Sequence, residues 1–391
     1  MEKTSLGKSL QKYTMIIALV AVIIFFNWGT KGTILFPQNV NNLISQNAYV
    51  FVLATGMLLC ILTGGNIDLS VGSIIAFAGG IGASMMAKGT NWIVASIVML
   101  LVGALAGAFQ GYWIAYVNVP PFIATLAGMY GFRGLANVVH GGQAIGVNDE
   151  TFLKVFGGGA DCYVPDLLGG GEGNNMLCIV AGIVIAVLVI VMTFGKRISE
   201  KKQGYEVDPI LPVVIKTVAI AAVTLWLFCM ILAKHKGIPS SLIWIAIVVI
   251  IYNYVTNNTT IGRYLYAVGG NAKATRLCGV NTKNIFFIAY VNMGLLAGLA
   301  SILVIARAVG SQPTFGQGYE MDAIAACFIG GASAYGGIGT VPGTIIGAIL
   351  MGVINQGMSI MSVDANYQKV VKGLVLLVAV TFDVLSKREK K

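Results

Sequence analysis

Apolar runs long enough to cross a membrane recur from one end of the chain to the other. A helix of about 20 apolar residues crosses a hydrocarbon core of roughly 30 Å. Backbone groups in lipid find no water to bind, so repeated runs of this length favour helices, whose hydrogen bonds are internal. Only 10% of the residues are charged, whereas soluble domains have roughly 25%. The sequence therefore predicts an all-α integral membrane protein, a polytopic helical bundle.

Polar breaks divide the chain into apolar segments near residues 13–29, 48–63, 71–87, 92–117, 122–140, 177–195, 211–233, 241–256, 285–308, 321–335, 343–362 and 366–385. We expect about 10–12 transmembrane helices, one of them broken or re-entrant, in a single transmembrane domain over residues 1–391. Glycines four apart, as at Gly103 with Gly107 and at Gly294 with Gly298, predict close helix packing in lipid.

The charged residues make one side of the predicted bundle basic. Lysines and arginines cluster near the N-terminus, over 196–202, over 261–284 and over 387–391, while the glycine-rich loop over 141–175 is acidic. The positive-inside rule then places both termini in the cytoplasm. The net charge of +10 does not indicate nucleic-acid binding, because the basic residues are scattered between spans instead of gathered on one face.

One polar stretch over residues 64–73 joins two apolar runs with too few residues for an ordinary exposed loop. It contains Asn66, Asp68 and Ser70. Irregular backbone at membrane depth is tolerated only where it is buried in protein or lines a wet cavity, and transporters use discontinuous helices beside their substrate path. We therefore expect a broken or re-entrant helix here, beside a translocation path.

Three further charged residues fall where charge is costly. Arg133 lies within an apolar stretch, and an intramembrane arginine is expected to meet an acidic residue, with Asp68 as the candidate, or a backbone carbonyl. Glu320 and Asp322 enter another apolar run. The simplest interpretation of these acids is a helix N-cap, and the alternative is a place on the translocation path.

The basic stretch over 261–284 has the pattern of an organised helix. Asn271 is a good N-cap and Gly279 a good helix stop, so the intervening run is predicted to be a short helix that follows a break at Gly269 and Gly270. The stretch contains Arg276 among its bases and no acidic residue. It is either a docking element that faces the cytoplasm or a solvated loop that obeys the positive-inside rule.

The chain offers no set of residues typical of an enzyme. Its two histidines, His140 and His235, have no neighbouring cluster suited to a metal site or a catalytic triad. The six cysteines show no metal-site spacing, and only Cys162 and Cys178 are placed to meet outside. No phosphate-binding loop is present. We expect no catalytic residue, no metal and no cofactor, with any ATP bound by a separate subunit.

Four long motifs resemble the permease subunits of bacterial ABC importers for monosaccharides, the ribose, galactoside and xylose group. They are GGNIDLSVGS from Gly64, VPPFIATLAGMYGFRG from Val119, GRYLYAVGGNAKATRLCGV from Gly262 and YEMDAIAACFIGGASAYGGIGTVPG from Tyr319. The resemblance covers nearly the whole chain. An apparent extra hairpin of two spans over about 176–236 is similar to the xylose or multiple-monosaccharide branch.

The resemblance implies a type II ABC importer-like fold in the bacterial cytoplasmic (inner) membrane. It implies a second permease copy, a cytoplasmic ABC ATPase subunit and an extracytoplasmic sugar-binding protein as partners, with membrane lipid around the bundle and a xylose-, galactose- or glucose-type monosaccharide as substrate. It makes the stretch over 261–284 a coupling helix for the ATPase, with roles for Gly262, Arg263, Gly269, Gly270, Asn271, Ala272, Ala274, Arg276, Leu277 and Gly279.

An ion-coupled secondary sugar transporter or channel is the alternative. Such a protein needs an ion-coupling acid deep within its spans, and Asp68 is the good candidate. It would leave the basic stretch over 261–284 without a purpose.

Overall fold

The computed structural model describes residues 3–159, 162–169, 174–205 and 209–388, and these segments are helical almost throughout. In the described chain the strands are β1 (Ile145–Gly146) and β2 (Gly310–Ser311), which pair antiparallel with Ile145 opposite Ser311. The contacts divide the chain into two compact units. The short helices η1 (Thr33–Leu35) and α2 (Pro37–Gln46) lie where the chain passes between them.

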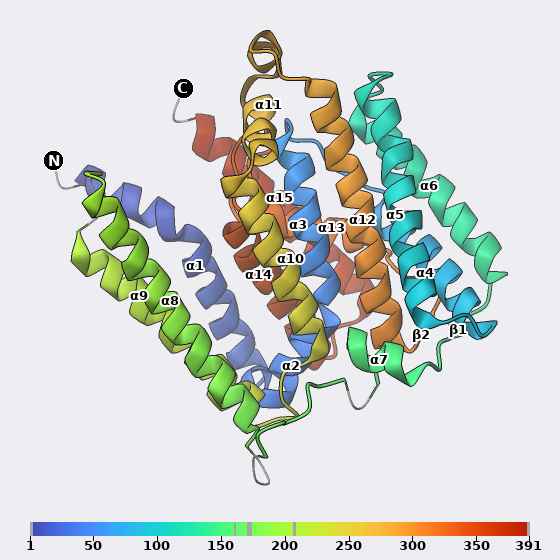
Figure 1. Cartoon of the computed structure of the whole chain (residues 1–391), viewed down its shortest axis with the longest axis horizontal. Coiled ribbons are helices and arrows are strands. Elements are labelled where there is room, and N and C mark those ends of the chain that lie inside the picture. The colour runs from blue at the N-terminus through green and yellow to red at the C-terminus, as the bar shows by residue number, and fades with distance from the viewer. Residues whose placement is uncertain (1–2, 160–161, 170–173, 206–208, 389–391) are drawn as a thin grey trace. The chain divides into compact units, whose positions relative to one another are not determined.

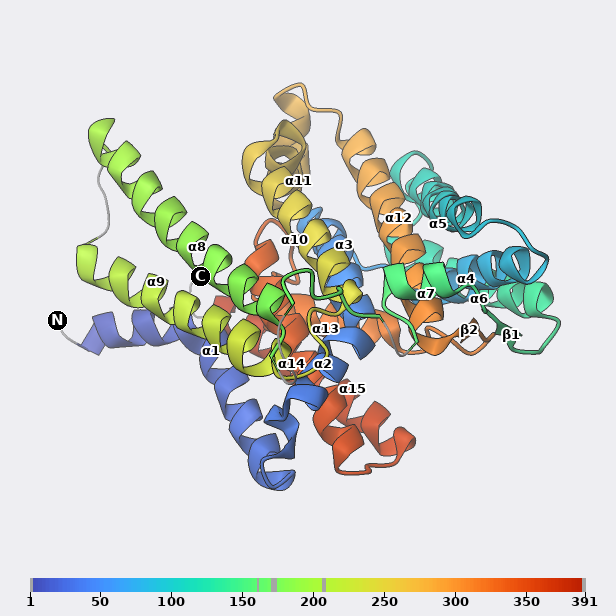
Figure 2. The ribbon, with the colours of Figure 1, turned by 60° about the horizontal axis from the view of Figure 1, so that its bottom comes forward.

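The first unit comprises residues 1–34, 43–162 and 241–391. Its helices are α1 (Lys3–Gly29), α3 (Ala48–Leu62), α4 (Val71–Ala87), α5 (Trp92–Ala115), α6 (Pro121–His140), α7 (Glu150–Phe156), α10 (Ser240–Asn258), α11 (Thr260–Leu277), α12 (Thr282–Ala308), α13 (Tyr319–Ile329), α14 (Val341–Ile360) and α15 (Ala365–Arg388). Every residue of α3 is buried. Figures 1 and 2 show α12 between α3 and α5, and it packs on both.

Glycines bring α5 and α12 into backbone contact. A Cβ atom added at Gly294 would lie 2.8 Å from the Cα atom of Gly107, and one added at Gly103 would lie 2.9 Å from that of Gly298. Helices in lipid gain from such close approach because it maximises van der Waals contact. The packing predicted from the glycine spacing is therefore confirmed.

The second unit comprises residues 35–42 and 163–240. Its helices are α8 (Met176–Lys202) and α9 (Ile210–Leu225), which continues into a π-helical turn, η2 (Trp226–Leu232). Asn175 caps α8 by accepting a hydrogen bond from the Cys178 backbone nitrogen at 3.0 Å. The hairpin predicted over 176–236 falls within this unit.

Among the described residues, seven helices are long and apolar enough to cross a membrane, namely α5, α6, α8, α9 with η2, α10, α12 and α14. Helices α2 and α3, bent by 45° at their junction, together make an eighth candidate, and Met15–Gly29 and α4 are apolar but shorter. The class of fold is therefore confirmed, with fewer full-length spans than expected.

The span predicted over 321–335 is wrong. Helix α13 has 11 residues, or about 16 Å at 1.5 Å per residue, which is roughly half of a hydrocarbon core. The apolar run continues beyond it, but Gly331 has a positive φ of 84°, a conformation that ends a helix and suits glycine.

Candidate functional site

The chain between α3 and α4 is irregular and partly buried, as the polar stretch over 64–73 predicted. Residues 63–70 are not helical, and Asp68 and Ser70 are fully buried among them. Asp68 Oδ1 accepts hydrogen bonds from the Ser70 backbone nitrogen at 2.8 Å and from Ser70 Oγ at 2.6 Å. Gln110 Nε2 on α5 donates to the same Ser70 hydroxyl at 2.6 Å, and Asn66 Nδ2 donates to Thr63 Oγ1. This segment, which we call the broken helix below, is an irregular link between α3 and α4 with its polar side chains turned to protein groups; the bent helix pair in the structure is α2 with α3.

Arg133 on α6 meets backbone carbonyls, so the predicted pairing with Asp68 is wrong. Its Nη1 atom donates to the carbonyl oxygen of Pro313 at 2.8 Å and to that of Phe315 at 2.6 Å. Asp68 has its own donors in Ser70, and Arg133 finds two acceptors in the loop before α13. A half-buried guanidinium satisfied by carbonyls is the second outcome expected of an intramembrane arginine. Arg133 thereby fixes the path of residues 313–315.

Asp322 is the centre of a buried polar network, and its interpretation as an N-cap is wrong. Helix α13 begins after Gly318, and Asp322 lies fully buried in its first turn. Its Oδ2 atom accepts from the Tyr49 hydroxyl at 2.7 Å, from Lys372 Nζ at 2.9 Å and from Asn355 Nδ2 at 3.4 Å. The carboxylate therefore ties α13 to α3, α14 and α15.

Sequence reasoning missed the partners of Asp322. Lys372, a lysine inside the last apolar run, could have indicated a buried acidic partner, because a charge in such a position is usually paired. Tyr49 and Asn355 carry no comparable signal, since a tyrosine or an asparagine in a span is not by itself unusual.

The two polar segments picked out in the sequence touch each other. A Cβ atom added at Gly72, just beyond the broken helix, would overlap the Gly316 carbonyl oxygen and lie 2.7 Å from Glu320 Oε2. Gly72, in the first turn of α4, therefore lies directly against Gly316 and Glu320. The structure brings together the segment that contains Asn66, Asp68 and Ser70 and the segment that contains Glu320 and Asp322, with Arg133 holding the second.

The structure confirms the short helix predicted in the basic stretch, within α11. The break that precedes it lies at Asn271, one residue after the predicted Gly269 and Gly270. The backbone is helical through Gly269 and Gly270 and non-helical at Asn271, with φ −159° and ψ 97°. Asn271 Oδ1 accepts from the Ala274 backbone nitrogen at 3.0 Å, so Asn271 is an N-cap. The chain leaves the short helix at Gly279, with φ 87°. Its tip is exposed, and Leu277 retains 89% of its accessible surface.

The remaining residues predicted for coupling lie along the same helix. Gly262 and Arg263 are in the first turn of α11, where Thr259 Oγ1 accepts from the Gly262 backbone nitrogen at 3.2 Å. The short helix beyond the kink presents exposed residues, namely Ala272, Ala274, Arg276 and Leu277. Their exposure leaves them available to a partner.

Near its kink, α11 contacts the last residue of α3 and the loop at Gly337 through backbone atoms. A Cβ atom at Gly269 would overlap the carbonyl oxygen of Leu62, the last residue of α3, and lie 3.0 Å from the Cα atom of Gly337. The Gly337 backbone nitrogen donates to Leu62 O at 3.0 Å. Tyr266 on α11 donates from its hydroxyl to Gly339 O at 2.8 Å. Burial raises the pKa of Tyr266, which keeps this donor protonated.

The loop over 333–339 continues this contact to the polar segment. A Cβ atom at Gly336 would lie 2.9 Å from the carbonyl carbon of Gly64, and one at Gly65 would lie 2.8 Å from that of Ala334. The loop thus lies between α11 and residues 63–70. A continuous series of contacts leads from α11 at Gly269, just before its kink, to the broken helix.

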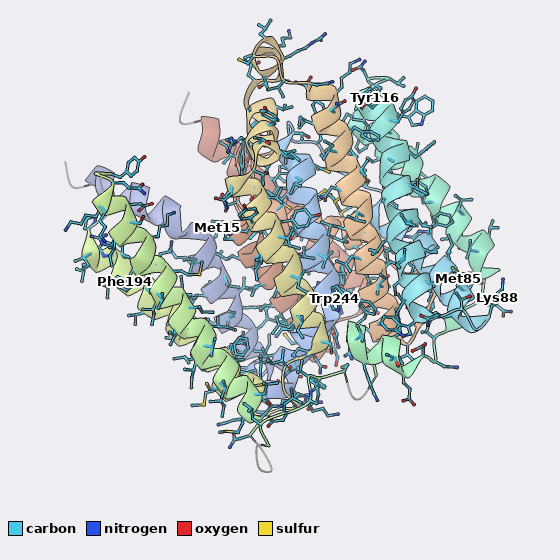
Figure 3. All side chains as sticks on the ribbon, viewed as in Figure 1. Met15, Met85, Lys88, Tyr116, Phe194 and Trp244 are labelled. Carbon is cyan, nitrogen blue, oxygen red and sulfur yellow. The ribbon has the colours of Figure 1, made fainter. Side chains whose placement is uncertain are left out.

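Helix α11 is also connected to α12 by a short link. Asn281 caps α12 by accepting from the Asn284 backbone nitrogen at 3.3 Å. The Tyr116 hydroxyl, at the end of α5, donates to Asn284 Oδ1 at 2.9 Å, and Figure 3 shows Tyr116 at this end of α5. Contacts therefore connect α11 to α12 and α5 as well as to the end of α3.

Comparison with known proteins identifies relatives along nearly the whole chain. Residues 39–380 match the family described as branched-chain amino acid transport system / permease component. The xylose transport system permease protein XylH of Escherichia coli (strain K12) is 33% identical over 386 residues, which cover 97% of this chain and 93% of that protein. XylH of Haemophilus influenzae (strain ATCC 51907 / DSM 11121 / KW20 / Rd) is 34% identical over 97% of this chain and 98% of its own. The ribose import permease protein RbsC of Escherichia coli (strain K12) is 33% identical over 88% of this chain and 85% of its own. No solved structure gives a significant match.

Proposed function

The chain belongs to the family of permease components described as branched-chain amino acid transport system / permease component, and from this we propose that it is the membrane-spanning subunit of an ATP-driven monosaccharide importer. The observation that carries the choice of substrate class is the match to xylose permeases over 97% of the chain. The family description names amino acids, but the ribose permease also points to a monosaccharide. A pentose such as xylose is the first substrate to test.

The partners in this proposal are a cytoplasmic ABC ATPase that binds the ATP, an extracytoplasmic sugar-binding protein and a second copy of the permease. The exposed short helix with Arg276 and Leu277 supports a docking role for α11, because a basic helix with one apolar tip suits a cleft on a soluble subunit. Figure 1 shows the described ends of α1 and α15 toward the same end of the first unit as α11. We place that end in the cytoplasm, as the positive-inside rule requires.

The mechanism that we propose is alternating access. Closure of the ATPase dimer on ATP displaces the short helix of α11, and the joint at Gly269 passes the displacement to the end of α3. The broken helix over 63–70 and the half-span α13 then change which side of the membrane the path faces. A neutral sugar needs few fixed charges along such a path, which agrees with Asp68 and Asp322 both being engaged by neighbouring groups.

Transport by a reconstituted complex tests the proposal. Uptake of radiolabelled D-xylose into proteoliposomes that contain the permease, the ATPase and the binding protein should require all three proteins and ATP. The same measurement on the permease alone tests the main alternative. Uptake of xylose without the ATPase would replace the proposal with an ion-coupled transporter or a channel.

A further inference from the structure

A small cavity lies at the end of the first unit opposite α11. It has a volume of about 150 Å³ and is formed by the start of α3, the end of α12 and the loop before α13. Helix α12 starts just after α11 and has 27 residues, so at 1.5 Å per residue its far end lies about 40 Å away. The cavity is therefore separated from the coupling helix by the thickness of the bundle.

The lining of the cavity combines aromatic rings with hydrogen-bonding groups. Tyr49 and Tyr319 contribute stacked rings with centroids 3.7 Å apart, while Arg307, Gln46 and Ser45 contribute polar atoms. Small-molecule sites have this composition, in which a largely apolar wall is joined by a few polar groups that fix orientation. The volume exceeds the roughly 10–15 Å³ that one water needs on the same measure, so the cavity has room for a ligand larger than a water molecule.

Arg133 and Asp322, which the sequence singled out, bind residues that line the cavity without lining it themselves. Arg133 binds the carbonyl of Phe315 at 2.6 Å, and Phe315 lines the cavity. Asp322 accepts the Tyr49 hydroxyl at 2.7 Å. These contacts of Arg133 and Asp322 hold the lining residues in place before a ligand arrives.

The polar groups that line the cavity suit a neutral polyol better than an amino acid. Arg307 supplies a fork of N–H donors, and Gln46 and Ser45 can both donate and accept. Among the described residues that line the cavity there is no carboxylate, so the ammonium group of an amino acid would have no counterion. Sugar hydroxyls both donate and accept, so they suit Gln46 and a guanidinium that carries five N–H donors, and the apolar face of a sugar ring can lie against a tyrosine ring.

We propose that this cavity is a receiving subsite for a neutral monosaccharide, where the sugar first contacts the permease on its way to the broken helix. The inference rests on the proposed function and goes beyond it, since it assigns sugar contact to Tyr319, Arg307 and Gln46. Binding there is weak, because the sugar must leave again toward the path.

Binding to the purified permease in nanodiscs tests the subsite directly. Saturation-transfer NMR should show contact with D-xylose or D-ribose and none with L-leucine. Arg307→Gln should weaken the sugar affinity roughly tenfold, the factor that one hydrogen bond to a charged group supplies. Leu303→Trp, which fills the cavity from α12, should abolish the signal. Lys88→Gln removes an exposed cation between α4 and α5 (Figure 3) and serves as the matched control, with wild-type binding expected.

Uptake by the full complex separates failure of the subsite from failure of the function. Wild-type uptake by a folded Arg307→Gln complex at low sugar concentration, or binding of leucine in place of sugar, would overturn the subsite and leave the importer intact. Absence of sugar uptake by the wild-type complex would overturn the proposed function itself, and the subsite with it. Reduced uptake by Arg307→Gln together with normal uptake by Lys88→Gln would support the inference.

Discussion

Replacing Gly269 with alanine tests the joint between the coupling helix and the broken helix. The added methyl group would overlap the Leu62 carbonyl oxygen and approach Gly337. Both neighbours are backbone, so no side-chain rotamer can relieve the overlap and the helices must move apart. Overpacking of this kind costs about 1–3 kcal/mol. Alanine is favoured over glycine in a helix by up to about 1 kcal/mol, which offsets part of that loss.

The neighbouring residue provides a matched comparison for stability. A Cβ atom at Gly270 meets nothing within 4 Å, so Gly270→Ala gains the helix propensity without the overlap. The two variants should therefore differ by roughly 1–3 kcal/mol in free energy of unfolding, or about 1–4 °C in melting temperature for a chain of 391 residues. Thermal unfolding of the purified permease, followed by circular dichroism, measures this difference.

Transport measures the consequence for coupling. In the complex with ATPase and binding protein, Gly269→Ala should lower the sugar imported per ATP hydrolysed, because the joint no longer passes the motion of α11 to α3. Gly134→Ala, on the open side of α6, controls for a glycine-to-alanine change in a helix. Equal melting temperatures for the Gly269 and Gly270 variants, with wild-type transport by both, would refute the reasoning.

Three further predictions concern other contacts. Lys372→Met alone should destabilise the permease by about 3–5 kcal/mol, because it leaves the Asp322 carboxylate buried without a cation. Asp322→Leu in the same chain should restore only part of that loss in denaturant unfolding, because Tyr49 and Asn355 lose their acceptor; an equal loss in the double variant would contradict this. Arg276→Glu or Gly279→Pro should leave the permease folded while uncoupling ATP hydrolysis from uptake, and wild-type uptake by either variant would exclude a docking role for α11. Gly107→Val should lower the melting temperature by separating α5 from α12, by more than the same change at an open helical glycine.

Local patterns predicted the elements that depend on nearby residues. The segment expected over 71–87 is α4, Val71–Ala87, because an apolar run between polar breaks defines a helix in lipid. The cap at Asn271 and the stop at Gly279 were predictable because capping uses residues a few positions apart. The broken helix over 63–70 followed from the cost of polar groups at membrane depth.

Long-range contacts were beyond such reasoning. Tyr49 and Asp322 are 273 residues apart in sequence, and neither the apolar runs nor the glycine spacing relates them. The same is true of Arg133, whose acceptors are carbonyls 180 and 182 residues away, because any backbone segment can offer a carbonyl. The sequence therefore marked which charges had to be satisfied, and the fold decided how.

The choice of glycine along the route from α11 to the broken helix has a mechanical consequence. A contact between side chains can absorb a small displacement by a change of rotamer, whereas a contact between backbones cannot. The route passes through Gly269 against Leu62, Gly336 against Gly64 and Gly65 against Ala334, and each contact has backbone on both sides. A displacement that the ATPase imposes on α11 would therefore reach residues 63–70 with little loss. Gly269 gives up helix stability to allow this close contact, whereas Gly65 and Gly336 have positive φ angles that suit glycine, and larger side chains introduced along the route should weaken coupling more than they weaken the fold.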